Sequence, residues 1–128
     1  PVVGYRTDEL PAFWSRSSGI AAPLRLDAAE DIAAFWRGRK GIGQQGAILV
    51  ANPVPGDSEI PADIMSSHIA DAVRAAEAEG IRGKKVTPFL LGKILELTEG
   101  TSLAANIALI RNNARLADEI AVALAATA

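Results

Sequence analysis

The residues of this chain best suited to bind a ligand are amides set among apolar neighbours. Asn106 and Asn113 lie seven residues apart on one face of an expected helix, amid Ile107 and Leu109. Asn52 follows an apolar run, at the end where open α/β sheets bind ligands. A buried amide needs partners for its donors and acceptors. Two interpretations stay open: these amides bond a helix to a loop, or they bind the polar edge of a ligand.

Two polar residues, Thr7 and Asp8, directly follow the first apolar run, residues 2–5. They could cap a turn or help to form a binding pocket. His68 is the only histidine, and it lies in the middle of an expected helix. No other ligand surrounds it at metal-binding spacing, so the sequence favours a helix-surface residue over a metal ligand.

No motif in the chain carries a reaction by itself. There is no glycine-rich dinucleotide or phosphate loop and no Gly-x-Ser-x-Gly turn. The absence of cysteine excludes disulfides, thiolate catalysis and cysteine zinc sites within these residues. An imine-forming lysine needs a lowered pKa. The local sequence favours a solvated side chain for each of the four lysines, Lys40, Lys84, Lys85 and Lys93.

Composition limits the function classes. The chain has 128 residues, a net charge of −2 and 49% hydrophobic residues, which fits one domain with a sizeable core. Its charges are interspersed, and no clustered basic face predicts nucleic-acid binding. The longest apolar stretch, 120–128, is too short to span a membrane. We therefore expect a cytoplasmic protein that binds neither nucleic acid nor membranes.

The elements that position these residues alternate between strands and helices. Apolar runs predict strands at 2–5, 23–26 and 46–51. Helices are expected from 27 to about 41, from 61 to 79, from 87 to 98, and from 101 or 102 almost to the C-terminus. Asp27, paired with Glu30 as a capping box, and Thr87 are the expected N-caps, and Gly80 and Gly100 the expected stops. The pattern predicts an α/β fold.

So few strands do not make a stable sheet alone. The chain also opens inside a strand-like run without an initiating methionine. We therefore expect residues 1–128 to be one portion of a single domain, with the rest of the sheet supplied from elsewhere.

Four segments together resemble the pseudouridine-5′-phosphate glycosidase family, also called the indigoidine-synthase-A-like family. They are GYRTDELPAFW (4–14, then Arg16 and Ser18-Gly19), VANPVP (50–55), IRGKKVTPFLL (81–91), and ELT (96–98) with SLAANIAL (102–109) and NNA (112–114). They follow the family's order over nearly the whole chain. The family more often has Phe where Leu10 stands and Tyr where Trp14 stands, which bears on substrate detail more than on fold.

The resemblance implies a three-layer α/β/α fold with a mixed sheet, commonly assembled as a homotrimer. This chain would be its helix-rich C-terminal portion. It also implies reversible cleavage of the C–C glycosidic bond of pseudouridine 5′-phosphate, giving uracil and ribose 5-phosphate. The family uses a lysine imine, a glutamate proton donor and a divalent metal, typically Mn²⁺. Those groups fall in the family's N-terminal part, so no catalytic or metal-ligating residue is expected in this chain.

The resemblance carries over to particular residues. Asn106 matches the asparagine of the family's Asn-Ile-Ala-Leu motif and is expected to contact the pyrimidine. Asn113 is a second candidate, and Thr7, Asp8 and Phe13 are expected to shape the pocket. Two other functions stay open. One is a C-glycosynthase that joins ribose 5-phosphate to an aromatic aglycone. The other is a non-catalytic assembly module whose alanine-rich helices form an oligomer interface.

Overall fold

Three short apolar segments form a parallel sheet in the computed structural model, which describes residues 1–126. Strand β1 (Val2–Tyr5) lies between β2 (Arg25–Leu26) and β3 (Leu49–Ala51). The register pairs Gly4 with Arg25 on one side and with Ala51 on the other. The three predicted strands are confirmed. The third begins later than expected, at Leu49, since Gly46 has a φ of 102° that extended strands do not adopt.

Four α-helices follow or separate the strands. They are α1 (Ala29–Gly41), α2 (Ala62–Ala78), α3 (Val86–Leu97) and α4 (Thr101–Ala125). Short 3₁₀ turns, η1 (Gly56–Ser58) and η2 (Gly83–Lys85), lead into α2 and α3. The predicted stops are confirmed: Gly80 and Gly100 have φ values of 66° and 86°, the left-handed conformation in which glycine ends a helix.

Two predicted N-caps are wrong. The N-cap of α1 is Ala28, because the Asp27 carboxylate instead accepts a 2.8 Å hydrogen bond from Nε of Arg25. The N-cap of α3 is Lys85, the last residue of η2. That 3₁₀ turn runs directly into the helix and places Thr87 inside it. In both cases a neighbouring interaction displaced the local capping pattern.

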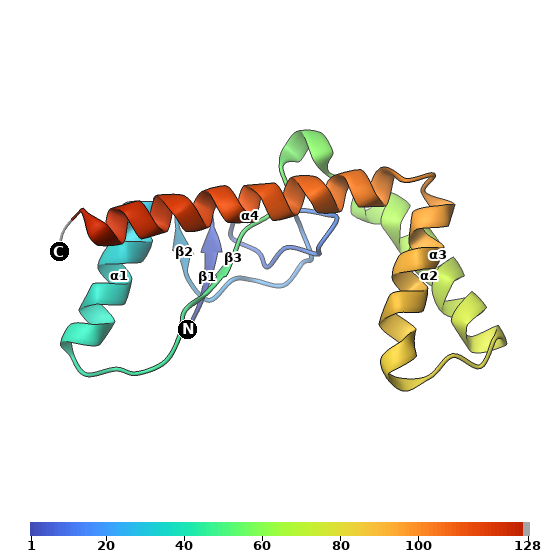
Figure 1. Ribbon diagram of the computed structural model, residues 1–128, viewed down its shortest axis with the longest axis horizontal. Helices are drawn as coiled ribbons and strands as arrows, with labels where there is room; N and C mark the ends of the chain where they lie inside the picture. Colours follow the sequence, from blue (N-terminus) through green and yellow to red (C-terminus); the bar gives the residue numbers. More distant parts are fainter. Residues whose placement is uncertain (127–128) are drawn as a thin grey trace.

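Helix α4 runs along most of the molecule, from α1 and the sheet to the corner where it meets α3 (Figure 1). At one end it packs on α1 and the sheet, where Leu116 joins an apolar cluster with Tyr5, Ala29 and Ile32. At the other end, beside α2 and α3, Ala105 belongs to a second cluster; its other buried members are Ile60, Met65, Ala72 and Ile94. The molecule therefore has two small cores that share one helix.

The predicted α/β class, helix-rich in its C-terminal half, is confirmed. The described strands all run parallel, so the mixed sheet is a prediction about the larger fold. None of the helices among residues 1–126 combines the length and apolar character needed to cross a membrane.

Gly4 gives a direct test of how closely the loop after β1 covers the sheet. A Cβ atom added there would lie 2.5 Å from the backbone oxygen of Thr7. We expect Gly4→Ala to lower the free energy of unfolding by about 1–3 kcal/mol, because a packed backbone must move. Gly38 in α1 is the control, since a Cβ there has no neighbour within 4 Å. Gly38→Ala should raise stability by about 0.5–1 kcal/mol. Urea unfolding that ranks the two variants equally would contradict the packing described here.

Candidate functional site

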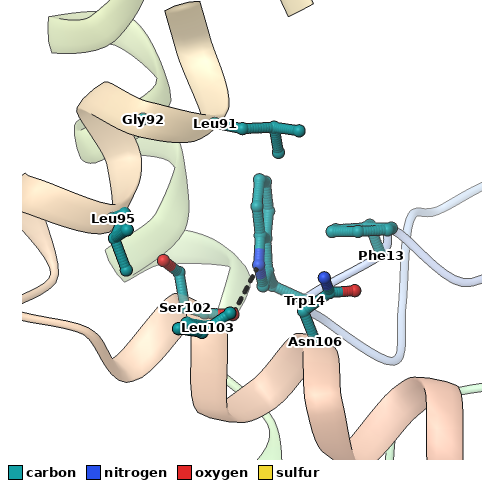
Figure 2. A pocket seen from close by; sticks show the side chains of 8 residues that line it. All are labelled: Phe13, Trp14, Leu91, Gly92, Leu95, Ser102, Leu103 and Asn106. Atoms are coloured by element: carbon teal, nitrogen blue, oxygen red, sulfur yellow. Dashed lines mark hydrogen bonds between the residues drawn. The ribbon is translucent and has the colours of Figure 1, made fainter. Parts of the chain in front are cut away.

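A hollow of about 250 Å³ lies where the loop after β1 meets the corner between α3 and α4. Its lining is mostly apolar, which is typical of small-ligand pockets. Figure 2 shows the lining residues: Phe13 and Trp14 from the loop, Leu91, Gly92 and Leu95 from α3, and Ser102, Leu103 and Asn106 from α4. The predicted residues Asn106 and Phe13, far apart in sequence, are thus brought together.

The two aromatic residues lie at the tip of a tight turn. Ala12 and Ser15 pair across it, and Phe13 has a φ of 64°, which is rare for a bulky side chain. The Phe13 and Trp14 rings meet edge to face, with centroids 4.7 Å apart and planes at 90°. A backbone held in this region costs about 1–3 kcal/mol and persists only where the surroundings fix it.

Hydrogen bonds to the segment between β3 and α2 hold this turn. Ser15 is buried, and its hydroxyl donates to the carbonyl of Ile60 at 2.7 Å. The Ile60 amide in turn donates to the carbonyl of Trp14 at 2.9 Å. Nη1 of Arg16 donates to the carbonyl of the fully buried Val54 at 2.7 Å. The loop is therefore fixed on a buried segment rather than left to its own conformation.

A second set of bonds fixes the α3–α4 corner against the loop. Nε1 of Trp14 donates to the carbonyl of Ser102 at 3.2 Å. The Ser102 amide donates to the hydroxyl of Thr98 at 3.2 Å, and that hydroxyl donates to the carbonyl of Ile94 at 2.7 Å. Through these contacts the loop, the end of α3 and the first turn of α4 form one bonded unit.

Asn106 provides the amide of the hollow. It is half-buried on α4, and its side chain extends toward Phe13 and Trp14 (Figure 2). Within residues 1–126 the amide has no hydrogen-bond partner. It therefore offers one acceptor oxygen and two N–H donors to a ligand in the hollow.

The other asparagine amides make hydrogen bonds within the chain. Nδ2 of Asn52 donates to Oδ1 of Asn113 at 3.0 Å, and Nδ2 of Asn112 donates to the carbonyl of Pro53 at 3.2 Å. These bonds join α4 to the loop after β3, which is the helix-to-loop interpretation of the sequence. Asn113 does not line the hollow. Its contact with substrate stays a prediction.

Thr7 and Asp8 line a different, polar hollow of about 300 Å³ together with Arg16 and Arg25. The Thr7 hydroxyl donates to the carbonyl of Glu9 at 3.0 Å and so closes a turn. The Asp8 carboxylate accepts from Nη1 of Arg25 at 2.7 Å in an exposed ion pair. The structure separates both residues from Asn106 and Phe13, and their part in shaping a substrate pocket stays a prediction.

Lys93 differs from an imine-forming lysine. The Glu96 carboxylate, 2.8 Å from Nζ of Lys93, raises the pKa of that ammonium group, whereas an imine-forming lysine needs a lowered pKa. Nζ of Lys40 lies 4.9 Å from the ring centroid of Trp36. Within residues 1–126, no set of three His, Asp or Glu side chains comes together that could ligate a metal ion.

Comparison with known proteins identifies the family. The model of the indigoidine synthase A like proteins matches residues 1–123. The chain belongs to this family. A pseudouridine-5′-phosphate glycosidase of Methylobacterium nodulans is 60% identical over 124 residues, which cover 97% of this chain and 37% of that protein. The resemblance found in the sequence is thus confirmed.

Two solved structures are similar to this chain. An indigoidine synthase A-like protein of Thermotoga maritima has a TM-score of 0.81 at 40% identity, covering 97% of this chain and 40% of that one. The prealnumycin C-glycosynthase AlnA, in complex with ribulose 5-phosphate, has a TM-score of 0.85 at 30% identity, covering 99% and 42%. This member of the family therefore spans about two fifths of the length of the proteins it matches.

The sequence did not predict Trp14 or the leucines of α3 as lining residues. A signal for Trp14 was present, because the family more often has Tyr at this position and the departure bears on substrate detail. Leu91 and Leu95 gave no such signal. An apolar helix residue has the same pattern whether it packs in a core or faces a hollow.

Glu9 makes the loop after β1, the aromatic loop that carries Phe13 and Trp14, sensitive to acid. Hydrogen bonds from the Ser17 hydroxyl and from the Gly19 amide, the latter at 2.8 Å, lower the pKa of its carboxyl. Because the folded-state pKa lies below the unfolded-state value, this stabilisation is present at neutral pH and lost as the pH falls through the lowered pKa. Trp14 fluorescence, isolated in a Trp36→Phe background, should change below about pH 4.3, the ordinary pKa of glutamate. Glu9→Gln should abolish that transition, and an unaltered transition would contradict the assignment.

Proposed function

We propose that this chain is the C-terminal portion of a pseudouridine-5′-phosphate glycosidase. The enzyme would reversibly split the C–C glycosidic bond of pseudouridine 5′-phosphate into uracil and ribose 5-phosphate. The observation that carries the proposal is the 60% identity, across 97% of this chain, to a protein named for that activity. The apolar hollow with its unpaired Asn106 amide supports it independently.

In this proposal the hollow holds the pyrimidine. A uracil ring is flat, and its edge alternates N–H donors with carbonyl acceptors. The Asn106 amide can donate to a carbonyl and accept from an adjacent N–H at the same edge. The faces of the ring would contact the aromatic side chains of Phe13 and Trp14, which line the hollow beside the amide. What these residues contribute is binding and orientation of the aglycone.

The covalent chemistry is assigned to the part of the enzyme outside residues 1–126. A C–C glycosidic bond lacks the oxygen that an ordinary glycosidase protonates, so an imine between a lysine and the opened ribose is a chemically reasonable route. The lysine, the proton-donating glutamate and the Mn²⁺ ligands would all lie in the N-terminal portion. When bound, the metal would supply positive charge to the part of the site that lies outside these residues.

An exposed apolar surface along α4 indicates contacts with further parts of the enzyme. Leu103, Ile107 and Ile110 recur at helical spacing along α4 and are 49%, 42% and 58% exposed. Apolar stripes of this kind mark protein contacts. We assign this surface to the N-terminal portion of the enzyme or to neighbouring subunits of a homotrimer, and we place the enzyme in the cytoplasm.

A second function is favoured by one observation. The similarity to the C-glycosynthase AlnA is compatible with a chain that helps to join ribose 5-phosphate to an aromatic aglycone. Product analysis of the full-length enzyme that carries these residues, with ribose 5-phosphate and with uracil present or absent, distinguishes the two functions. Pseudouridine 5′-phosphate formed only when uracil is present supports the glycosidase.

Substitution of Asn106 tests the proposed site. In the full-length enzyme, Asn106→Ala removes two hydrogen bonds to uracil, each worth about 1 kcal/mol, and should weaken uracil binding roughly 30-fold. The thermal unfolding midpoint should hardly change, because the amide has no partner within the described chain. Gln44→Ala removes an exposed amide outside the hollow, so it is the control and should leave uracil affinity unchanged. Isothermal titration calorimetry and thermal unfolding measure both quantities.

The opposite pattern would support a non-catalytic assembly module instead. In that case Asn106→Ala would lower the unfolding midpoint while the affinity for uracil, per folded molecule, stayed the same.

A further inference from the structure

Trp14 lies in the middle of the residues that line the hollow. Figure 2 shows its indole with Leu95 and Leu103 on one side and Phe13 and Asn106 on the other. The indole therefore divides the lining into an aromatic half, which carries the Asn106 amide, and a leucine half. A ligand that binds to the amide meets the indole before it reaches the leucines.

We propose that Trp14 determines the size of the aglycone, by limiting the space beside Asn106 to a single ring and by fixing the turn of α4 that carries Asn106. The inference rests on the proposed function, because it specifies the ligand class of the same site. The ligand would be a flat, one-ring heterocycle with an alternating donor and acceptor edge.

The indole is held rigidly enough to act as a size limit. The backbone carbonyl of Trp14 accepts a hydrogen bond from the Ile60 amide at 2.9 Å. The next residue, Ser15, is buried, and its hydroxyl donates to the carbonyl of Ile60. The indole ring meets the Phe13 ring edge to face and packs against the cluster that contains Ile60 and Ala105. A tryptophan side chain has only two rotatable torsions, so these contacts leave it little freedom.

The hydrogen bond to Ser102 connects the indole to Asn106. In an α-helix the carbonyl of residue 102 accepts the backbone N–H of residue 106. Nε1 of Trp14 donates to this same carbonyl at 3.2 Å. The loop thus bonds to the turn that carries the ligand-binding amide. Trp14 is in this respect a positioning residue for Asn106, in addition to forming a wall of the hollow.

A smaller side chain at position 14 would join the two halves of the hollow. The leucine half already offers apolar surface, because Leu95 and Leu103 are 39% and 49% exposed. A second ring fused to the pyrimidine would then lie against these leucines while its polar edge still reached Asn106. Loss of the indole should therefore weaken the binding of a one-ring ligand and favour a two-ring ligand.

The test compares two ligands in the full-length enzyme. Uracil is the one-ring probe, and quinazoline-2,4-dione, a uracil with a fused benzene ring, is the two-ring probe. Calorimetry gives the dissociation constant of each for the parent enzyme, Trp14→Phe and Trp14→Ala. We expect the ratio of quinazolinedione affinity to uracil affinity to rise roughly 10-fold or more in Trp14→Ala, as a change of pocket size produces, and to rise less in Trp14→Phe. Trp36→Phe changes a tryptophan outside the hollow and should leave the ratio unchanged.

Each other outcome overturns the inference in a recognisable way. If both ligands weaken by the same factor in Trp14→Ala and in the more conservative Trp14→Phe, the residue only supports the fold. If neither affinity changes in Trp14→Ala while the parent binds uracil and cleaves pseudouridine 5′-phosphate, the size limit lies elsewhere and the proposed function stands. If the parent neither binds uracil nor cleaves that substrate, the proposed function fails, and the inference fails with it.

Discussion

The structure depends on one helix that is buried in two places at once. Helix α4 contributes Leu116 to the cluster over the sheet and Ala105 to the cluster at the far end. Neither cluster is large, and the described strands are only two to four residues long. Because both clusters share α4, its position along the sheet sets the position of every residue on its first turns. The hollow lies against those turns, and so its geometry follows from packing that is distant from it.

The hollow combines a fixed frame with one uncommitted polar group. Trp14, Ser15, Thr98 and Ser102 are all bonded within the fold, whereas the Asn106 amide has no partner among residues 1–126. A half-buried amide without a protein partner gains hydrogen bonds when a ligand of matching polarity binds. The positive φ of Phe13 belongs to the fixed frame. The contacts that hold the turn offset the free-energy cost of that backbone conformation. Rigid walls reduce the entropy lost on binding.

The sequence indicated the elements and the family, but it placed the site residues only in part. Glycine stops and apolar runs are local signals, so Gly80, Gly100 and the three strands were predicted well. The caps at Asp27 and Thr87 failed because Arg25 and the η2 turn compete for the same positions. Helical spacing alone made Asn106 and Asn113 equivalent, since both face one side of a helix, and only the family motif singled out Asn106. Only tertiary structure shows that Asn113 is bonded to Asn52 while Asn106 faces the aromatic loop. Trp14 and the leucines of α3 depend on contacts between distant segments, which periodicity does not report.

We propose that the hollow between the Phe13–Trp14 turn and α4 holds the aglycone. A crystal structure of the full-length enzyme with uracil and ribose 5-phosphate is the decisive test of this placement. We expect a pyrimidine ring in that hollow, beside Trp14, with its polar edge within hydrogen-bond distance of the Asn106 amide. A ring bound elsewhere, with the hollow filled by another segment of the enzyme, would contradict it.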